Sequence, residues 1–386
     1  MRDSDTNDEQ ERLVLESVDR FLQRHVAPVA SKLEHADEYP HELVERMKEL
    51  GLFGAVIPAE FGGLGLRPSV YAQIIEQMSR VWMSLAGIIN SHLIMAWIVA
   101  RKGTPEQKAS LLPRFATGEL KGGLALTEPD CGTDLQAIRT FARKDGADYV
   151  VNGTKTWISN GIHGSCFALL VKTDLSAEPR HKGMTMFIAE KADGFQAGRK
   201  LEKLGYKGID SAELIFQDYR VPASRLIGGR EGEGMACAIT GLELGRVNVA
   251  ARGVGLAQAA LDEAVRYSQQ RKTFGKPLHQ HQTIALKLAD MATRTMAARL
   301  LTRQAADALD RGERADYEAG MAKLFATEAA VDNAMDAMRI HGGYGYSKEF
   351  LVERLYRDAP LLVIGEGTNE IQRLIIARRL IERNPI

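Results

Sequence analysis

The first third of the chain has apolar residues at the spacing of amphipathic helices. The positions that carry this pattern are Val14, Val18, Phe21 and Leu22 in one segment and Leu43, Met47 and Leu50 in another. Residues three and four apart share a helix face, so each segment presents one apolar face to a core. Gly62-Gly63 and Gly65 interrupt the pattern and indicate an irregular loop. We therefore predict an all-helical domain over residues 1–122.

Short apolar runs replace the helical spacing in the middle third. The runs are Leu169–Val171, Met184–Ile188 and Leu214–Phe216, and Tyr149–Val151 directly precedes Asn152-Gly153. Such runs are typical of strands, and Asn-Gly is a strong signal for the turn of a β-hairpin. We predict a small β-barrel or sandwich domain over residues 123–228, with a hairpin turn at Asn152-Gly153.

Helical spacing returns after Gly228-Gly229 and continues nearly to the last residue. Its larger apolar positions are Ile284, Leu288, Met291, Met321, Leu324, Val331, Met335 and Met338, and its alanines include Ala250, Ala251, Ala257, Ala259 and Ala260. We expect the larger residues to form the core of a helix bundle and the alanines to let its helices approach closely. The bundle is predicted over residues 229–386, which makes the chain an α+β protein.

Composition limits the number of domains and the classes of partner. A chain of 386 residues exceeds the roughly 250–300 residues that one core supports, so two or three domains are expected. Lysine plus arginine (50) equals aspartate plus glutamate (50), which gives no overall field to attract nucleic acid or an anionic membrane. The polar start from Met1 and the lack of about 18 uninterrupted apolar residues indicate neither a signal peptide nor a membrane span. We expect a cytoplasmic protein.

Familiar nucleotide and metal motifs do not occur in the sequence. It has no G-x-G-x-x-G after a strand, no Walker loop, no G-x-S-x-G and no H-E-x-x-H. Cys131, Cys166 and Cys237 are far apart, which fits a reduced interior better than a disulfide framework or zinc site. His279 and His281 are two residues apart and would not converge on a metal from one helix. We expect no metal and no doubly wound nucleotide fold.

Two segments could hold a flat ligand. Residues 125–134 (ALTEPDCGTD) form a turn whose backbone amides and hydroxyls, those of Thr127 and Thr133, could bond to polar edge atoms. Residues 153–161 (GTKTWISNG) place Trp157, whose indole could wall an aromatic cofactor, among small hydroxyl residues. Taken alone, the first is better explained as an ordinary polar turn, and a core tryptophan explains the second equally well.

A third segment carries a candidate base. Glu366 lies between Gly365 and Gly367, directly after the apolar run 360–364. Partial desolvation there would raise the pKa of the carboxyl, and the glycines would leave room for a ligand against it, as a general base requires. A helix start with Thr368 as cap and Glu370 in its first turn is compatible with this role.

In this order and at these separations, the segments resemble the acyl-CoA dehydrogenase family of flavoproteins. The similarity also includes 58–63 (PAEFGG), 271–275 (RKTFG) and 340–346 (IHGGYGY), so it covers nearly the whole chain. It implies an N-terminal helical domain, a central β domain and a C-terminal four-helix bundle. FAD would lie between the last two and reach a neighbouring subunit. The assembly would be a homotetramer, a dimer of dimers.

The resemblance also implies which residues bind. Around the flavin ring it places Leu124, Leu126, Thr127, Gly132, Thr133, Trp157, Ile158 and Ser159, and its other FAD positions are Arg271, Thr273, Phe274, His281, Gln282, Arg339, Gly342, Gly343, Thr368 and Glu370. For the acyl-CoA substrate it implies Thr133, Glu243, Arg246, Gly365 and Gly367. Glu366 matches the catalytic base that removes the α-proton while the β-hydride passes to FAD. Some relatives carry their base at the position of Gly245, which cannot abstract a proton. An electron-transfer flavoprotein would accept the electrons, in the catabolism of fatty or other carboxylic acids.

Two positions depart from straight-chain members of the family. Arg339 stands where many have glutamine, which changes a contact to the cofactor. Gly365 stands where many have tyrosine, and the smaller residue would widen the pocket for a branched, cyclic or aryl acyl group.

Other functions on the same fold are weighed against these residues. An enoyl-CoA reductase would look the same in sequence. Nitroalkane oxidase has aspartate at the position of Glu366 and the monooxygenases lack the carboxylate, so both fit less well than a dehydrogenase. A non-enzymatic relative that binds nucleic acid would be expected to carry a basic patch or extension, which the neutral charge balance does not favour.

Overall fold

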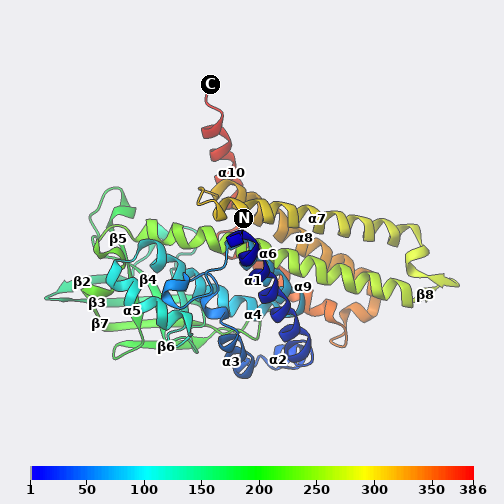
Figure 1. The fold of residues 1–386 in the computed structure, drawn as a ribbon, viewed down its shortest axis with the longest axis horizontal. Coiled ribbons are helices and arrows are strands. Elements are labelled where there is room, and N and C mark those ends of the chain that lie inside the picture. Colours follow the sequence, from blue (N-terminus) through cyan, green and yellow to red (C-terminus); the bar gives the residue numbers. More distant parts are fainter. Residues whose placement is uncertain (1) are drawn as a thin grey trace.

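The computed structural model describes residues 2–386, with side chains from Glu9 onward. Met1, where the polar N-terminal segment begins, lies outside the described residues. The chain forms helices, then a sheet, then helices again, and the sheet and the far end of the last helices lie at opposite ends of the long axis (Figure 1). The predicted order of helical, β and helical regions is therefore confirmed.

The N-terminal region is helical. Its elements are α1 (Arg2–Phe21), η1 (Leu22–Val26), α2 (Ala30–Ala36), α3 (His41–Glu49), η2 (Leu52–Gly54), η3 (Ala59–Phe61), α4 (Pro68–Lys102) and α5 (Pro105–Ala116). The start of α5 is fixed by a capping box, in which Thr104 and Gln107 bond to each other's backbone amides. Val18, Phe21 and Met47, predicted to face a core, are buried.

Helix α4 is the buried centre of this region. Among residues 2–386 it is the one helix long and apolar enough to cross a membrane, but 89% of its most apolar window is buried inside the protein. We therefore assign α4 to the core. Its backbone leaves helical geometry at Trp82 (φ −158°, ψ 105°), whose indole nitrogen donates to the buried Glu34 carboxylate at 2.8 Å. This kink ties α4 to α2.

The central region is a 7-stranded sheet in the order β1-β4-β2-β3-β7-β6, with β5 paired to β4. The strands are β1 (Gly122–Ala125), β2 (Phe141–Asp145), β3 (Asp148–Ser159), β4 (Cys166–Lys172), β5 (Met184–Glu190), β6 (Phe195–Lys200) and β7 (Ser211–Pro222), with short helices η4 (Leu135–Ala137), η5 (Arg180–Gly183), η6 (Ala223–Arg225) and η7 (Ile227–Gly229) between or after them. The predicted hairpin turn at Asn152-Gly153 is wrong, because β3 continues through both residues. The register against β7 shifts between Val151 and Gly153, so the extended glycine (φ 143°) marks a bulge. The tight connection lies at Gly146, between β2 and β3.

The C-terminal region is a helix bundle. Its elements are α6 (Gly234–Gln270), β8 (Lys272–Thr273), β9 (Lys276–Pro277), η8 (Leu278–Gln280), α7 (Gln282–Asp310), α8 (Asp316–His341), η9 (Gly342–Tyr346), α9 (Leu351–Ile364) and α10 (Asn369–Arg383). In Figure 1, α6 runs along the long axis from the sheet to the β8-β9 ribbon at the other end.

The buried face of this bundle differs from the prediction. Of the larger residues expected in the core, Met291 is fully buried, whereas Ile284, Leu288, Met321, Leu324, Val331, Met335 and Met338 are only half-buried. The buried positions of α8 are instead small: Ala319, Ala322, Ala326, Ala329, Ala330, Ala334 and Ala337. Alanines bring the helix backbones close together, so the longer side chains are displaced to the flanks. The alanines predicted to pack closely in α6 are all buried.

Candidate functional site

Glu366 lies in the short connection between α9 and α10. Helix α9 ends before Gly365, and α10 begins at the Thr368 cap, whose hydroxyl accepts from the Ile371 amide. Two glycines flank Glu366, which itself adopts the left-handed conformation (φ 58°) with Gly367 at φ 86°. Because side chains rarely adopt this conformation, the turn is strained. The Glu366 carboxylate lies against Asn90 on α4 and Gly245 on α6.

The Glu366 carboxylate is sheltered and incompletely bonded. Its Oε2 atom is buried and has no hydrogen-bond partner among the described residues, while Oε1 accepts from the Asn90 amide at 3.5 Å. Burial raises the pKa of Glu366, and the nearby Arg252 and Arg246 charges oppose that rise. A carboxylate with a raised pKa and a free oxygen can accept a proton from a ligand placed against it.

Gly245 on α6 faces this carboxylate. A β-carbon added at Gly245 would lie 2.5 Å from Glu366 Oε2 and 3.1 Å from its carboxyl carbon. Any side chain there would displace the carboxylate. Glycine is therefore required at this position to make room for the Glu366 carboxylate. Glycine also cannot itself act as a base.

The two ligand-binding segments expected from the sequence are in contact. The Thr156 amide donates to the Thr127 carbonyl at 2.9 Å. Beneath them the fully buried Lys155 ammonium donates to the Leu126 carbonyl at 2.9 Å and to the Glu128 carboxylate at 2.8 Å. This ion pair fixes the turn that carries Thr127 against strand β3.

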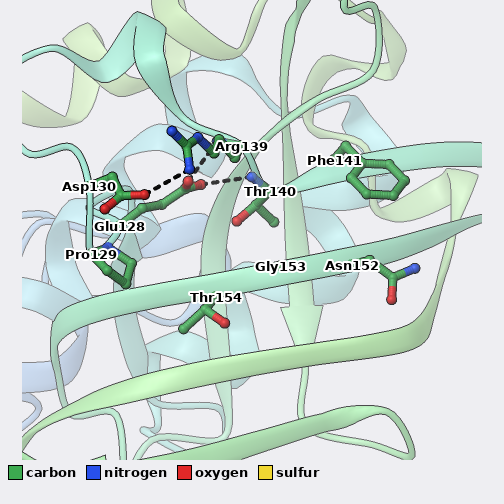
Figure 2. A pocket seen from close by; sticks show the side chains of 9 residues that line it. All are labelled: Glu128, Pro129, Asp130, Arg139, Thr140, Phe141, Asn152, Gly153 and Thr154. Carbon is green, nitrogen blue, oxygen red and sulfur yellow. Dashed lines mark hydrogen bonds and ion pairs between the residues drawn. The ribbon is translucent and has the colours of Figure 1, made fainter.

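Glu128 also holds the turn from the other side. Its carboxylate accepts from the backbone amides of Arg139 and Thr140 at 2.6 and 3.0 Å, and the bond to Thr140 is drawn in Figure 2. Together with the Lys155 ammonium, these amides give the buried carboxylate three hydrogen-bond donors, while Gly132 and Thr133 are exposed at the tip of the turn. The turn is rigid at its base and open at its tip.

Trp157 projects from the end of β3. It has a positive φ of 58° at a register shift between Lys155 and Ile158, and it is 58% exposed. Asn160 anchors this strand end to α4 and β1, because its amide donates to the carbonyls of Ile88 and Gly122 at 3.0 and 2.9 Å. An exposed indole on an anchored strand presents a fixed flat face, and the alternative of a core tryptophan is thereby contradicted.

Residues assigned by the resemblance to the rest of FAD lie at the other end of the molecule. Arg271, Thr273, Phe274, His281 and Gln282 surround the β8-β9 ribbon, which is far from the sheet in Figure 1, and Arg339, Gly342 and Gly343 are exposed at the end of α8. Phe274 is 97% exposed, and His281 Nε2 bonds to Thr273 at 3.2 Å. One chain therefore does not bring the two sets of predicted residues together.

Four of the five substrate positions lie beside Glu366 in the chain or on α6, the helix whose Gly245 faces its carboxylate. Gly365 and Gly367 flank it in the chain, whereas Glu243 and Arg246 come from α6. Burial raises the pKa of Glu243. The fifth, Thr133, is exposed at the tip of its turn.

Several polar residues near Glu366 were not predicted. These are Tyr71 and Asn90 on α4, Tyr206 in the connection before β7, and Asn248 and Arg252 on α6, and all five are buried. The sequence does mark the last two, because Asn248 and Arg252 are polar residues within an alanine- and valine-rich stretch of helix. The positions of the other three depend on contacts between distant segments.

A hollow that opens to solvent lies elsewhere in the described part of the chain. It is a shallow cavity of about 240 Å³ beside the Glu128 turn, lined by Glu128, Pro129, Asp130, Arg139, Thr140, Phe141, Asn152, Gly153 and Thr154 (Figure 2). None of the predicted site residues lines it, and its Arg139 and Asp130 side chains pair with each other at 2.9 Å. We place the functional site at Glu366 because the unpartnered carboxylate lies there.

Comparison with known proteins identifies the family. Residues 8–119, 123–219 and 232–381 match the N-terminal, middle and C-terminal domains of acyl-CoA dehydrogenases. An acyl-CoA dehydrogenase of Bacillus subtilis is 42% identical over 96% of this chain and 98% of its own length. A (2S)-methylsuccinyl-CoA dehydrogenase of Cereibacter sphaeroides is 40% identical over 97% of this chain and 70% of its own.

A solved structure agrees over the whole fold. The butyryl-CoA dehydrogenase of Megasphaera elsdenii superimposes with a TM-score of 0.93 at 35% identity, over 96% of this chain and 98% of that chain. Matching domains, sequence relatives and fold all lead to one assignment. The chain belongs to the acyl-CoA dehydrogenase family and is an oxidoreductase of that class.

Proposed function

We propose that this protein is an FAD-dependent acyl-CoA dehydrogenase in which Glu366 removes the α-proton of an acyl-CoA thioester. The observation that carries the proposal is the buried, unpartnered Oε2 of Glu366 in a strained turn between two glycines. When bound, FAD supplies the two-electron acceptor for the hydrogen that leaves the β-carbon. The product is the α,β-unsaturated thioester.

The carboxylate needs help to remove a carbon-bound proton. A thioester α-C–H is a far weaker acid than a carboxyl group, so the site must stabilise the negative charge that develops on the thioester oxygen. The backbone amide of Glu366 has no acceptor among residues 2–386 and can donate to that oxygen. The raised pKa of Glu366 makes it a stronger base than an exposed carboxylate.

The residues present fit FAD only if two copies of the chain share it. The exposed Trp157 and the open tip at Gly132 and Thr133 suit the ring, while the ADP half would bind at the β8-β9 end of a second copy. Apolar side chains are exposed along α7 and α10 and would be covered by that copy; they are Leu286, Met296, Leu300, Leu374, Leu380 and Ile381. We propose a homotetramer built as a dimer of dimers.

Two further assignments follow from the family resemblance. The electrons would pass to an electron-transfer flavoprotein, in a cytoplasmic pathway of carboxylic-acid catabolism. The acyl pocket would be wide beside the base, because a β-carbon at Gly365 would meet only the Leu361 carbonyl, at 3.4 Å. This space favours a branched, cyclic or aryl acyl group.

Anaerobic titration of the purified yellow protein with a panel of acyl-CoAs tests the proposal. Flavin absorbance should bleach with at least one thioester, and Glu366→Gln should bind FAD but bleach more than about 10³-fold more slowly, because the amide cannot take the proton. Glu349→Gln, the same change at an exposed position, should behave like the unmodified protein. Bleaching by Glu366→Gln at an unchanged rate would refute the assignment of the base.

A further inference from the structure

Two arginines are buried beside Glu366 without a carboxylate partner. Arg246 and Arg252 on α6 are 7% and 5% exposed, and among the described residues the Glu366 carboxylate interacts with both through charge but hydrogen-bonds to neither. The Nε atom of each is buried and has no hydrogen-bond partner among these residues. Burying a cation without a partner is costly, so such groups are typically kept for a ligand.

Arg252 lies on the face of α6 that looks at the base. It follows Gly245 by seven residues, which is two helical turns, so the two positions share a face about 10.5 Å apart along the axis. Gly245 faces the Glu366 carboxylate. We call the face of α6 from Gly245 to Arg252 the strip. Gly245 lies at the end beside the Glu366 carboxylate, and Arg252 lies at the far end.

The strip between the two ends is polar. The Asn248 amide donates to the Tyr71 hydroxyl at 2.8 Å, but the buried carbonyl oxygen of Asn248 has no partner among residues 2–386. Asn90 extends the polar wall to Glu366. An alkyl chain lying here would leave these groups unsatisfied, at a cost for each buried polar atom.

Tyr206 completes the far end of the strip. Its hydroxyl accepts from Arg252 at 3.0 Å and keeps its own proton to donate. The ring reaches this point because residue 87 on α4 is glycine: a β-carbon there would lie 1.4 Å from the Tyr206 hydroxyl. Helix α4, helix α6 and the connection before β7 therefore meet at the far end of the strip, which carries one cation and one hydroxyl that can donate a hydrogen bond.

We propose that the acyl group of the substrate carries a second carboxylate, which binds the Arg252 guanidinium and the Tyr206 hydroxyl. The substrate is then the mono-thioester of a short dicarboxylic acid, with its α-carbon at Glu366. This inference rests on the proposed function, since it takes the strip from Glu366 to Arg252 as the acyl site. A charge-assisted pair with Arg252 would satisfy its buried donors and discriminate against the uncharged analogue.

Matched thioesters test the inference. Glutaryl-CoA is compared with pentanoyl-CoA, and methylsuccinyl-CoA with 2-methylbutanoyl-CoA, so that each pair differs by one carboxylate in place of a methyl group. We expect kcat/KM to favour the dicarboxylic member of at least one pair by tenfold or more. Arg252→Gln should remove the preference by lowering kcat/KM for the dicarboxylic member alone, and Arg252→Lys should retain part of it.

Binding is measured separately from turnover. In Glu366→Gln, which cannot remove the proton, the flavin spectral shift reports ligand affinity, and the dicarboxylic member should bind at least tenfold more tightly than its partner. Arg354→Gln alters an equally buried arginine on α9, remote from Gly245 in the chain, and should leave both ratios unchanged.

Different results would contradict the inference and the proposed function on which it rests. If the unmodified protein reduces its flavin with the monocarboxylic thioesters as fast as with the dicarboxylic ones, the inference is wrong and the proposed function stands. If Arg252→Gln slows both members of a pair equally, Arg252 only positions or charges Glu366, and the inference is again wrong. If no thioester bleaches the flavin, the proposed function itself falls. Should Arg252→Gln fail to fold, the ratio measured on the unmodified protein decides.

Discussion

Replacing Gly245 by alanine tests the geometry of the base without touching the base itself. The added methyl would lie 2.5 Å from Glu366 Oε2. Ordinary carbon–oxygen contacts begin at about 3.3 Å, so the carboxylate must move by about 0.8 Å. A displacement of about 1 Å in a catalytic group costs about 10²-fold in rate. We therefore expect kcat to fall by about 10²-fold, with FAD still bound.

The measurement is anaerobic flavin bleaching by a saturating acyl-CoA, followed by stopped flow, with thermal unfolding recorded in parallel. Gly241→Ala is the matched control, because its methyl would meet the Ile98 and Ile94 side chains at 2.7 and 2.8 Å and does not meet Glu366. Both changes gain helix propensity of about 1 kcal/mol and both incur overpacking of about 1–3 kcal/mol. If Gly245→Ala bleaches within threefold of the unmodified protein, or if Gly241→Ala loses as much activity, the steric reasoning is refuted.

Two predictions concern stability. Lys155→Met should lower the free energy of unfolding in urea by about 3–5 kcal/mol, because it leaves the buried Glu128 carboxylate without its cation. Adding Glu128→Gln should recover part of this loss. A loss below about 1 kcal/mol for Lys155→Met would contradict the prediction. Burial and the nearby Glu34 carboxylate raise the pKa of Asp358 from 3.8 to about 7. The native state therefore holds a proton that the unfolded chain releases, and this contribution to stability disappears as the pH rises from about 4 through 7. Asp358→Asn cannot ionise, so its free energy of unfolding should fall less between pH 5 and pH 8 than that of the unmodified protein. The difference between the two falls should be on the order of 2–4 kcal/mol. Equal falls would show that Asp358 is not the titrating group.

Local sequence patterns predicted the regular elements well because their causes are local. The spacing of Val18 and Phe21 generates a helix face, and the run 184–188 generates a strand, whatever surrounds them. The Asn152-Gly153 prediction failed because the pairing of β3 with β7 extends the strand across a bulge that two residues cannot reveal. The domain limits at 122/123 and 228/229 stay predictions.

The core of the bundle was misjudged for a similar reason. Larger apolar residues such as Met321 and Met338 were favoured for the interior by their hydrophobicity alone. The structure buries alanines of α8 instead, because helices that approach closely can enclose only small side chains between them. Which face is covered depends on the neighbouring helix and on any second copy of the chain.

The sequence by itself determined the family, the order of the three regions and the candidate base, because Glu366 between two glycines is a pattern within three neighbouring residues. Only the tertiary structure placed Asn90, Tyr206 and Arg252 around that base, since they come from three separate regions of the chain. Burial and the lack of a partner arise from contacts between distant segments. Burial raises the pKa of Glu366, the Arg252 Nε atom has no hydrogen-bond partner among the described residues, and no local pattern of residues encodes either property.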